Sequence, residues 1–190
     1  MSVLETERLL FRHHEMGDME AFCEIESDAE YRWPQEVHPR AELERSFREG
    51  WLPPKSMGLL ATVFKPEQRY IGRCGLYPAR DEKDQIIPGE ACLAFYLARS
   101  HWRRGLATEA GQAFIPYGFN RLGLRRIEAG VNTSNFTSQR VLEKLGFTRI
   151  RSGEGNGQSW HLYELRNSEM RPECWEHSGG RRQLLKRNDQ

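Results

Sequence analysis

A short basic turn between a predicted strand and a predicted helix constrains this chain more than any other feature. The apolar run 91–98 has the composition of a strand, and helical spacing of apolar residues begins directly after Gly105. Arg103 and Arg104 lie between the two segments. The first amides of a helix have no partner inside the helix, and the helix dipole adds positive charge there. The stretch 102–110 therefore predicts a loop that holds a pyrophosphate, while the chemistry comes from the molecule that carries it.

The length and composition of the chain predict one domain followed by a tail. With 190 residues, of which 38% are hydrophobic, the chain is long enough to bury one core. The last residues are polar and include the pair Gly179 and Gly180. We expect residues 1–166 to form the domain and residues 167–190 to form a loosely ordered tail.

Charge and cysteine usage argue against several classes of function. The 28 basic and 27 acidic residues nearly balance, which is not typical of a nucleic-acid-binding protein. Cys23, Cys74, Cys92 and Cys174 lie far apart without a Cys-x-x-Cys pair, so we expect reduced thiols and no metal site. The sequence has no signal-peptide pattern and no apolar run of membrane-spanning length. We expect a soluble cytoplasmic protein with neither a nucleic acid nor a membrane as its partner.

Hydrophobic periodicity and turn residues divide the chain into short elements, with Pro116 expected to kink the third helix. Between residues 59 and 98 they predict an antiparallel meander. Helices are predicted over 17–28, 41–49, 105–122 and 135–145. Seven strands are predicted over 8–12, 59–64, 70–77, 91–98, 126–131, 147–151 and 159–165.

Four stretches in this order resemble the GNAT acetyltransferases, and most closely their branch of RimJ/RimL-type protein N-terminal acetyltransferases. They are 6–12, 70–76, the loop 102–110, and 132–147 with its ending Glu-Lys-Leu-Gly-Phe. Together they cover roughly residues 3 to 165. The resemblance implies an α+β protein with the GNAT acyl-CoA N-acyltransferase fold. Its mixed, mostly antiparallel sheet of seven strands is flanked by helices, and the strands 91–98 and 126–131 splay apart.

The resemblance implies acetyl-CoA as co-substrate, with its pantetheine arm in the gap between the splayed strands. A backbone N–H near Leu97 or Ala98, freed by the splay, would stabilise the oxyanion. The implied CoA contacts are Phe95, Tyr96, Leu97 and Ala98 for pantetheine, Arg103, Arg104, Gly105, Leu106, Ala107 and Thr108 for pyrophosphate, and Asn135, Ser138 and Arg140 on the second CoA segment.

Two departures from the family pattern affect the catalytic residues. Many relatives carry a tyrosine that protonates the leaving thiolate, and Leu142 stands at that position. Ser138 is a possible substitute as the acid. The family's glutamate on the strand before the loop falls near Cys92, while Glu90 lies two residues earlier. Residues two apart on a strand share a face, so Glu90 is the candidate base.

Each of these residues also has a structural interpretation. Arg103 and Arg104 could form a solvated turn, and Asn135 could cap a helix. Ser138 and Glu90 could face solvent without taking part in the chemistry.

The resemblance implies an acceptor site in the helical hairpin near the N-terminus, where Tyr31, Trp33 and Trp51 could line it or could simply pack. The predicted activity is transfer of the acetyl group of acetyl-CoA to a primary amine, either a protein N-terminus or a small molecule. The alternatives are a non-catalytic acyl-CoA-binding or regulatory module and an enzyme for longer acyl groups. We expect a monomer or a homodimer.

Overall fold

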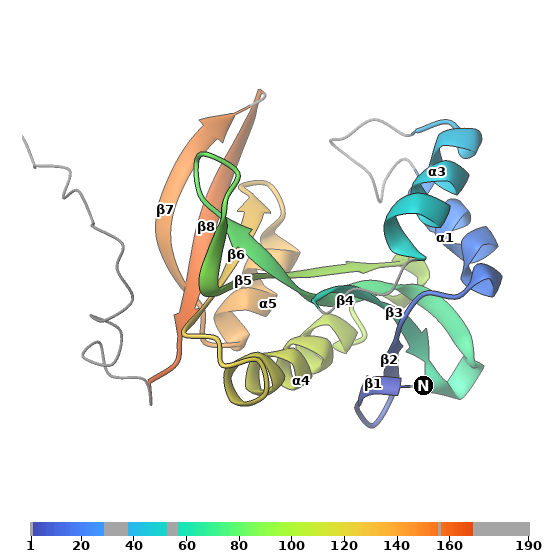
Figure 1. Cartoon of the computed structure of the whole chain (residues 1–190), viewed down its shortest axis with the longest axis horizontal. Helices are drawn as coiled ribbons and strands as arrows, with labels where there is room; N and C mark the ends of the chain where they lie inside the picture. The colour runs from blue at the N-terminus through green and yellow to red at the C-terminus, as the bar shows by residue number, and fades with distance from the viewer. Residues whose placement is uncertain (1, 29–37, 53–56, 156, 169–190) are drawn as a thin grey trace, which may run out of the picture.

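The computed structural model describes residues 2–28, 38–52, 57–155 and 157–168 (Figure 1). Its strands form one eight-stranded sheet in the order β1-β2-β3-β4-β5-β6-β8-β7. The strands are β1 (Ser2–Glu5), β2 (Leu9–Arg12), β3 (Gly58–Phe64), β4 (Arg69–Arg80), β5 (Ile86–Leu97), β6 (Arg126–Asn132), β7 (Thr148–Gly155) and β8 (Gln158–Arg166). The α-helices within the described ranges are α1 (Met19–Glu26), α3 (Arg40–Ser46), α4 (Leu106–Asn120) and α5 (Phe136–Lys144). Tyr31, Trp33 and residues 169–190 of the predicted tail lie outside the described residues.

The α+β class and the mostly antiparallel sheet are confirmed, but the predicted number of seven strands is wrong. The eighth strand is β1, which pairs antiparallel with β2 through Glu5 and Leu10. A turn joins the two strands, and the Thr6 N–H donates to the Leu9 carbonyl at 2.9 Å. A strand of four residues is too short to show an alternating pattern, so nothing in the sequence separated it from the turn.

The strands β5 and β6 are the one parallel pair in the described sheet, and they separate after a few residues. Their register is Glu90 with Arg126, Ala91 with Ile127, and Cys92 with Glu128. Beyond Cys92, β5 keeps only its antiparallel partner β4 through Leu97. The predicted splay between these two strands is therefore confirmed, and its vertex lies beside Cys92 and Glu128.

The helices divide between the two faces of the sheet (Figure 1). Successive side chains on a strand point to opposite faces. On β3, Leu60 belongs to the core under α4 and α5, whereas its neighbour Ala61 belongs to a second cluster under α1 and α3. On β4, Ile71 and Tyr70 divide in the same way.

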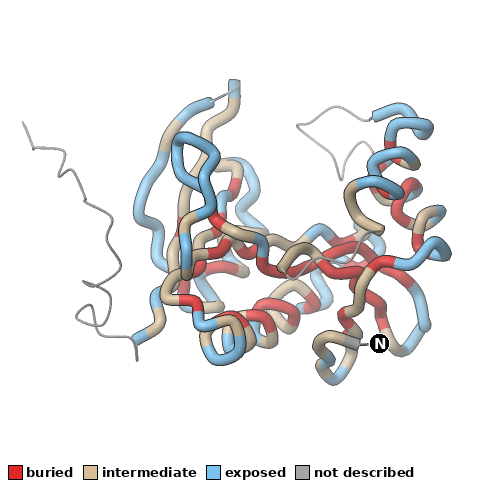
Figure 2. The backbone as a smooth tube through the Cα atoms, viewed as in Figure 1, coloured by how far each residue is buried: buried red, intermediate tan, exposed pale blue. Residues whose placement is uncertain are grey.

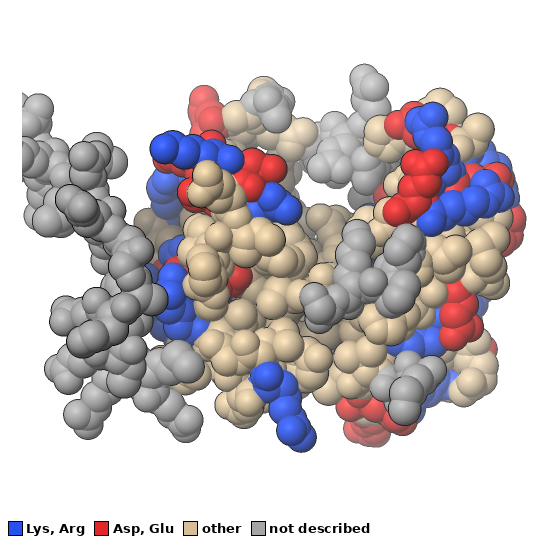
Figure 3. Space-filling view, viewed as in Figure 1, with Lys and Arg blue, Asp and Glu red and all other residues tan. Residues whose placement is uncertain are grey.

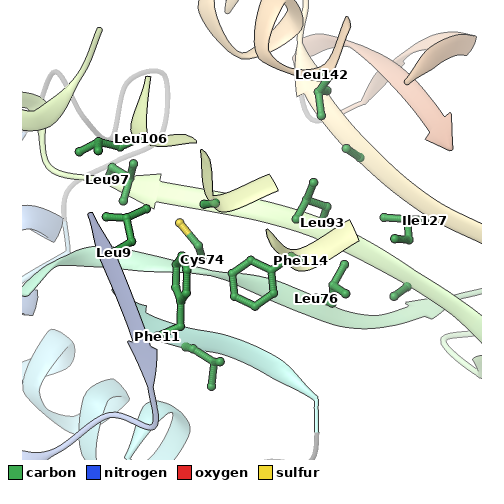
Figure 4. Close-up of a cluster of buried hydrophobic side chains, with 14 of the residues drawn as sticks. Leu9, Phe11, Cys74, Leu76, Leu93, Leu97, Leu106, Phe114, Ile127 and Leu142 are labelled. Carbon is green, nitrogen blue, oxygen red and sulfur yellow. The ribbon is translucent and has the colours of Figure 1, made fainter. Parts of the chain in front are cut away.

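The larger core fills the space between the sheet and α4. Phe114 of α4 lies among side chains of β2, β4 and β5, and its ring centroid is 4.7 Å from that of Phe11 (Figure 4). Figure 2 shows the buried backbone concentrated along the middle of the sheet and the inner side of this helix. The helix continues past Pro116 to Asn120. Its Gly111 allows a close approach to α5, because a Cβ atom there would lie 2.3 Å from a methyl group of Leu145.

Candidate functional site

The loop before α4 has an open helix N-terminus. Gly105 is the N-cap residue with φ of +78°, and no side chain caps the helix. Arg103 also has a positive φ, of +58°. A glycine adopts this backbone conformation without steric cost. The first amides of α4 thus have no side-chain partner, and pyrophosphate binding by the amides from Arg103 to Thr108 stays a prediction.

Contacts from Thr6 and Arg8, in the β1–β2 hairpin, hold this loop in place. The Arg8 Nη1 group donates to the Arg104 carbonyl at 3.0 Å, and Arg8 Nη2 lies 2.6 Å from Glu109 Oε2. The other oxygen of Glu109 accepts from the Thr6 hydroxyl at 2.6 Å and from the Arg8 N–H at 2.9 Å. Burial opposes ionisation, yet the bonds from Thr6 and Arg8 lower the pKa of Glu109. The partners are about a hundred residues apart in the chain, and no local sequence signal pairs them.

The two arginines of the loop differ in their surroundings. The Arg104 guanidinium lies over the Phe64 ring, 4.5 Å from its centroid, and 3.6 Å from Glu67 Oε1. Arg103 is exposed. The side chain of Arg104 is therefore turned toward the end of β3, and its contribution to a phosphate site would come from its backbone N–H.

The end of β5 offers fewer free backbone groups than the sequence predicts. The Ala98 N–H donates to the Ile71 carbonyl at 2.8 Å, so the splay does not free it, and Ala98 is excluded as the oxyanion donor. The Leu97 carbonyl accepts from Trp102 Nε1 at 2.6 Å. Because backbone groups alternate in direction along an extended strand, the N–H groups of Leu97 and Phe95 face the gap.

The second CoA segment begins at the open end of the gap, directly after β6. The Asn135 side chain accepts from the Ser138 N–H at 3.0 Å, so Asn135 caps α5. Ser138 is half-buried on the first turn, and Arg140 is exposed. Leu142, at the position of the family's tyrosine, is buried in the core. CoA contacts by Asn135, Ser138 and Arg140 stay predictions.

The predicted base Glu90 lies on the closed side of the vertex, inside an ion-pair cluster. Its Oε1 is 2.7 Å from Arg125 Nη2, and its Oε2 accepts from Arg126 Nε at 2.8 Å. The Glu90 side chain is 10% exposed. Two guanidinium groups thus occupy both oxygens, and an ammonium group would have to displace one of them. A role for Glu90 in proton transfer stays a prediction that this geometry does not favour.

A pocket of about 600 Å³ lies on the opposite face of the sheet, between β3–β4 and the segment after α3. Figure 3 shows the molecule hollowed there, between α3 and the β4–β5 hairpin. The pocket reaches β5 at Tyr96, one of the predicted pantetheine contacts. Its lining is His13, His14, Gly50, Trp51, Met57, Gly58, Leu59, Leu60, Arg73, Tyr77, Pro78, Arg80 and Tyr96.

Arg73, which lines this pocket, belongs to a buried ion pair. Arg73 of β4 pairs with Glu26 of α1, and their side chains are 8% and 4% exposed. The guanidinium carbon of Arg73 also lies 4.7 Å from the ring centroids of both Trp51 and Tyr96. Arg73 thereby connects the helical hairpin to the strand that borders the gap. The stretch 70–76, which contains Arg73, is one of the four that resemble the family, but no pattern in it predicts the ion pair with Glu26.

His14 is a second buried polar residue of the pocket. Its Nε2 lies 3.2 Å from the Leu59 carbonyl, and its ring packs against Phe47, Trp51 and Tyr70. Burial lowers the pKa of His14 to about 4. The imidazole is therefore neutral at pH 7 and donates to Leu59 through Nε2.

The described residues contain no group of three or more His, Cys, Asp or Glu side chains arranged to hold a metal ion. None of the helices in the described part of the chain is both long and apolar enough to cross a membrane.

Comparison with known families decides the identity of the fold. The family model "Acetyltransferase (GNAT) domain" matches residues 8–148. The chain belongs to the GNAT acetyltransferase family. It is an N-acetyltransferase by family, with the helix N-terminus and the splayed strands described above.

Individual relatives agree with this assignment. The chain is 32% identical to the uncharacterized N-acetyltransferase p20 of Bacillus licheniformis over 155 residues, which is 78% of this chain and 84% of that protein. The GNAT acetyltransferase structure from Bacillus anthracis has a TM-score of 0.73 at 23% identity, over 86% of this chain and 97% of its own. The spermidine N-acetyltransferase of Vibrio cholerae, solved with CoA and spermine, has a TM-score of 0.66 at 18% identity, over 85% and 96% of the two chains. These two structures share the fold.

Proposed function

We propose that the protein transfers the acetyl group of acetyl-CoA to a primary amine by direct attack. The observation that carries this proposal is the placement of the two candidate sites. The uncapped α4 N-terminus and the β5–β6 gap offer a binding site for CoA along one side of β5. The pocket of about 600 Å³ reaches the same strand at Tyr96 from the opposite face. A donor and an acceptor bound there would meet at β5.

In the proposed reaction the neutral amine nitrogen attacks the thioester carbonyl, and a C–N bond forms as the carbonyl becomes an oxyanion. The C–S bond then breaks, the CoA thiolate takes up a proton, and one proton of the original ammonium is released in the overall balance. The N–H groups of Phe95 and Leu97 face the gap, and that of Phe95, which is nearer to the point where β5 and β6 separate, is the proposed oxyanion donor. Positioning of the two reactants supplies much of the rate enhancement. Ser138 is the proposed proton donor to the thiolate.

The charge of the pocket favours some amines over others. Arg73 and Arg80 line it, and no carboxylate is among its described lining residues. A polyamine carries several positive charges, and this lining offers them no carboxylate partner. We therefore propose a singly charged amine as the acceptor, either a protein N-terminus, as in the RimJ/RimL-type branch, or a small molecule. We further propose that the protein acts in the cytoplasm as a monomer or a homodimer.

Two measurements together test this function. A ligand at about 100 times its dissociation constant stabilises the folded state by roughly 2.7 kcal/mol, so acetyl-CoA should raise the thermal midpoint clearly. A thiol-reactive dye then follows CoA release with a panel of amines that includes short peptides and spermidine. Release that depends on an amine supports the transferase. A raised midpoint without release for any amine favours the non-catalytic acyl-CoA-binding module instead.

A further inference from the structure

We propose that Glu128 of β6, rather than Glu90, accepts the proton that the acceptor ammonium loses before attack. This inference rests on the proposed acetyl transfer and adds a catalytic residue to it. The residue was not selected from the sequence, because it lies on a different strand from the one on which the resemblance places a glutamate.

The register of the sheet puts Glu128 at the vertex of the gap. Cys92 and Glu128 are the last paired residues of β5 and β6 before the two strands separate. Glu90 pairs with Arg126 two residues earlier, on the closed side of the vertex. A pantetheine arm that entered the gap would end near this vertex, so Glu128 is the nearer of the two carboxylates to the thioester.

The side chain of Glu128 lies on the same face as the acceptor pocket. Its neighbours Ile127 and Ala129 are buried in the core under α4, so Glu128 points to the opposite face. Cross-strand register places Cys92 beside Glu128 and Tyr77 beside Cys92. Tyr77 lines the pocket. Because adjacent strands are about 4.8 Å apart, the row from Tyr77 to Glu128 spans roughly 10 Å across the sheet.

The surroundings of Glu128 suit a proton acceptor better than those of Glu90. The Glu128 side chain is 14% exposed, and Oε1 lies 2.7 Å from Arg126 Nη1. That same arginine also serves Glu90 and Glu164. Burial raises the pKa of Glu128. A base with a raised pKa accepts a proton more readily near neutral pH.

Charged and titratable groups surround Glu128 on every neighbouring strand. The groups that act on it are Arg126 on its own strand, Glu90 on β5, Glu164 on β8 and Arg151 on β7, while the thiol of Cys92 responds to its charge. Three carboxylates share one arginine, so replacing Glu128 by a neutral amide removes repulsion from the cluster. The variant Glu128→Gln is therefore expected to fold.

The test compares Glu128→Gln with the control Glu164→Gln. Both variants remove a carboxylate that contacts Arg126, but Glu164 belongs to β8 and does not border the gap. Glu128→Gln should lower kcat about 100-fold or more and abolish the acidic limb of the pH profile of kcat/KM. The rise in thermal midpoint with acetyl-CoA should be unchanged. Glu164→Gln should keep kcat and retain the acidic limb, shifted to lower pH because a negative neighbour that raises the pKa of Glu128 is removed.

A second variant distinguishes loss of the base from a defect in folding. In Glu128→Ala, added formate should restore part of the activity, because a small carboxylate can occupy the space and take the proton. Wild-type turnover with an unchanged acidic limb in Glu128→Gln would overturn the role of Glu128 alone. The absence of wild-type turnover with every amine, despite stabilisation by acetyl-CoA, would overturn the proposed function and this role together.

Discussion

Arg73 and Glu26 form an ion pair inside the protein, with side chains that are 8% and 4% exposed. The pair joins α1 to the centre of the sheet, and the Arg73 guanidinium stacks 4.7 Å from the Tyr96 ring on β5. The contacts of Arg73 with Glu26 and Tyr96 thus fix the position of α1 relative to β5, the strand that borders the proposed CoA gap. The two residues are 47 positions apart in the chain.

Breaking this pair should destabilise the protein strongly. In Glu26→Gln the buried guanidinium of Arg73 loses the carboxylate of Glu26, and removal of one member of a buried pair costs about 3–5 kcal/mol. Urea unfolding followed by circular dichroism measures the loss. The double variant with Glu26→Leu and Arg73→Met should recover part of it, because no charge is left buried. A Glu26→Gln loss below about 1 kcal/mol would mean that the pair is solvated in solution.

His14 should make stability depend on pH in the mildly acidic range. Its pKa is lowered to about 4 in the folded protein, against about 6.5 in an unfolded chain. Between these values only the unfolded state takes up the proton, so stability falls as pH decreases from about 6.5 to about 4, by roughly 3 kcal/mol in all. Urea midpoints between pH 7 and pH 4 measure the slope. His14→Gln, which keeps a donor for Leu59, should flatten it, and an equal slope in that variant would assign the effect to other groups.

Glu109 should make stability depend on pH in a more acidic range than His14 does. Its folded pKa is depressed by bonds from Thr6 and Arg8 against the effect of burial, so its contribution is present above the unfolded pKa and lost as pH falls below it. Glu109→Gln should lower the thermal midpoint at pH 7 and change it little at pH 3. It should also weaken acetyl-CoA binding, because the contacts of Glu109 with Thr6 and Arg8 that hold the loop are weakened. The exposed Glu7→Gln on the same hairpin is the control and should alter neither quantity.

Gly105 and Gly123 provide a matched pair for the phosphate loop. Both have positive φ values, of +78° and +64°, and neither is crowded by backbone atoms. An alanine at either position should cost about 1–2 kcal/mol of stability through backbone strain. Only Gly105→Ala should reduce the affinity for CoA, measured by calorimetric titration, because Gly105 precedes the open amides of α4. An equal loss of affinity in Gly123→Ala would show that general destabilisation explains the effect.

The sequence predicts the loop and most strand positions because these depend on local patterns, whereas the splay of β5 and β6 is implied by the resemblance to the family. The glycine before α4, the alternation on β6 and the helical spacing of α4 each act within a few residues. The ion pairs Arg8–Glu109 and Arg73–Glu26 join segments that are distant in the chain, and no local sequence pattern predicts either pair.

The choice between Glu90 and Glu128 as the base shows the same limit of prediction from local patterns. Spacing along one strand indicates Glu90, but the pairing of β5 with β6 surrounds Glu90 with arginines and sets Glu128 beside the vertex. The register between two strands that are separated by a whole helix cannot be derived from the alternation of either strand.

The most direct test of acetyl transfer is to incubate the wild-type protein with acetyl-CoA and each amine of the panel, and to measure released CoA and acetylated amine together by mass spectrometry. We expect saturable release with one acetylated amine formed per CoA, for singly charged amines more than for spermidine. Acetyl-CoA that stabilises the fold while no amine in the panel becomes acetylated would contradict the proposed acetyl transfer.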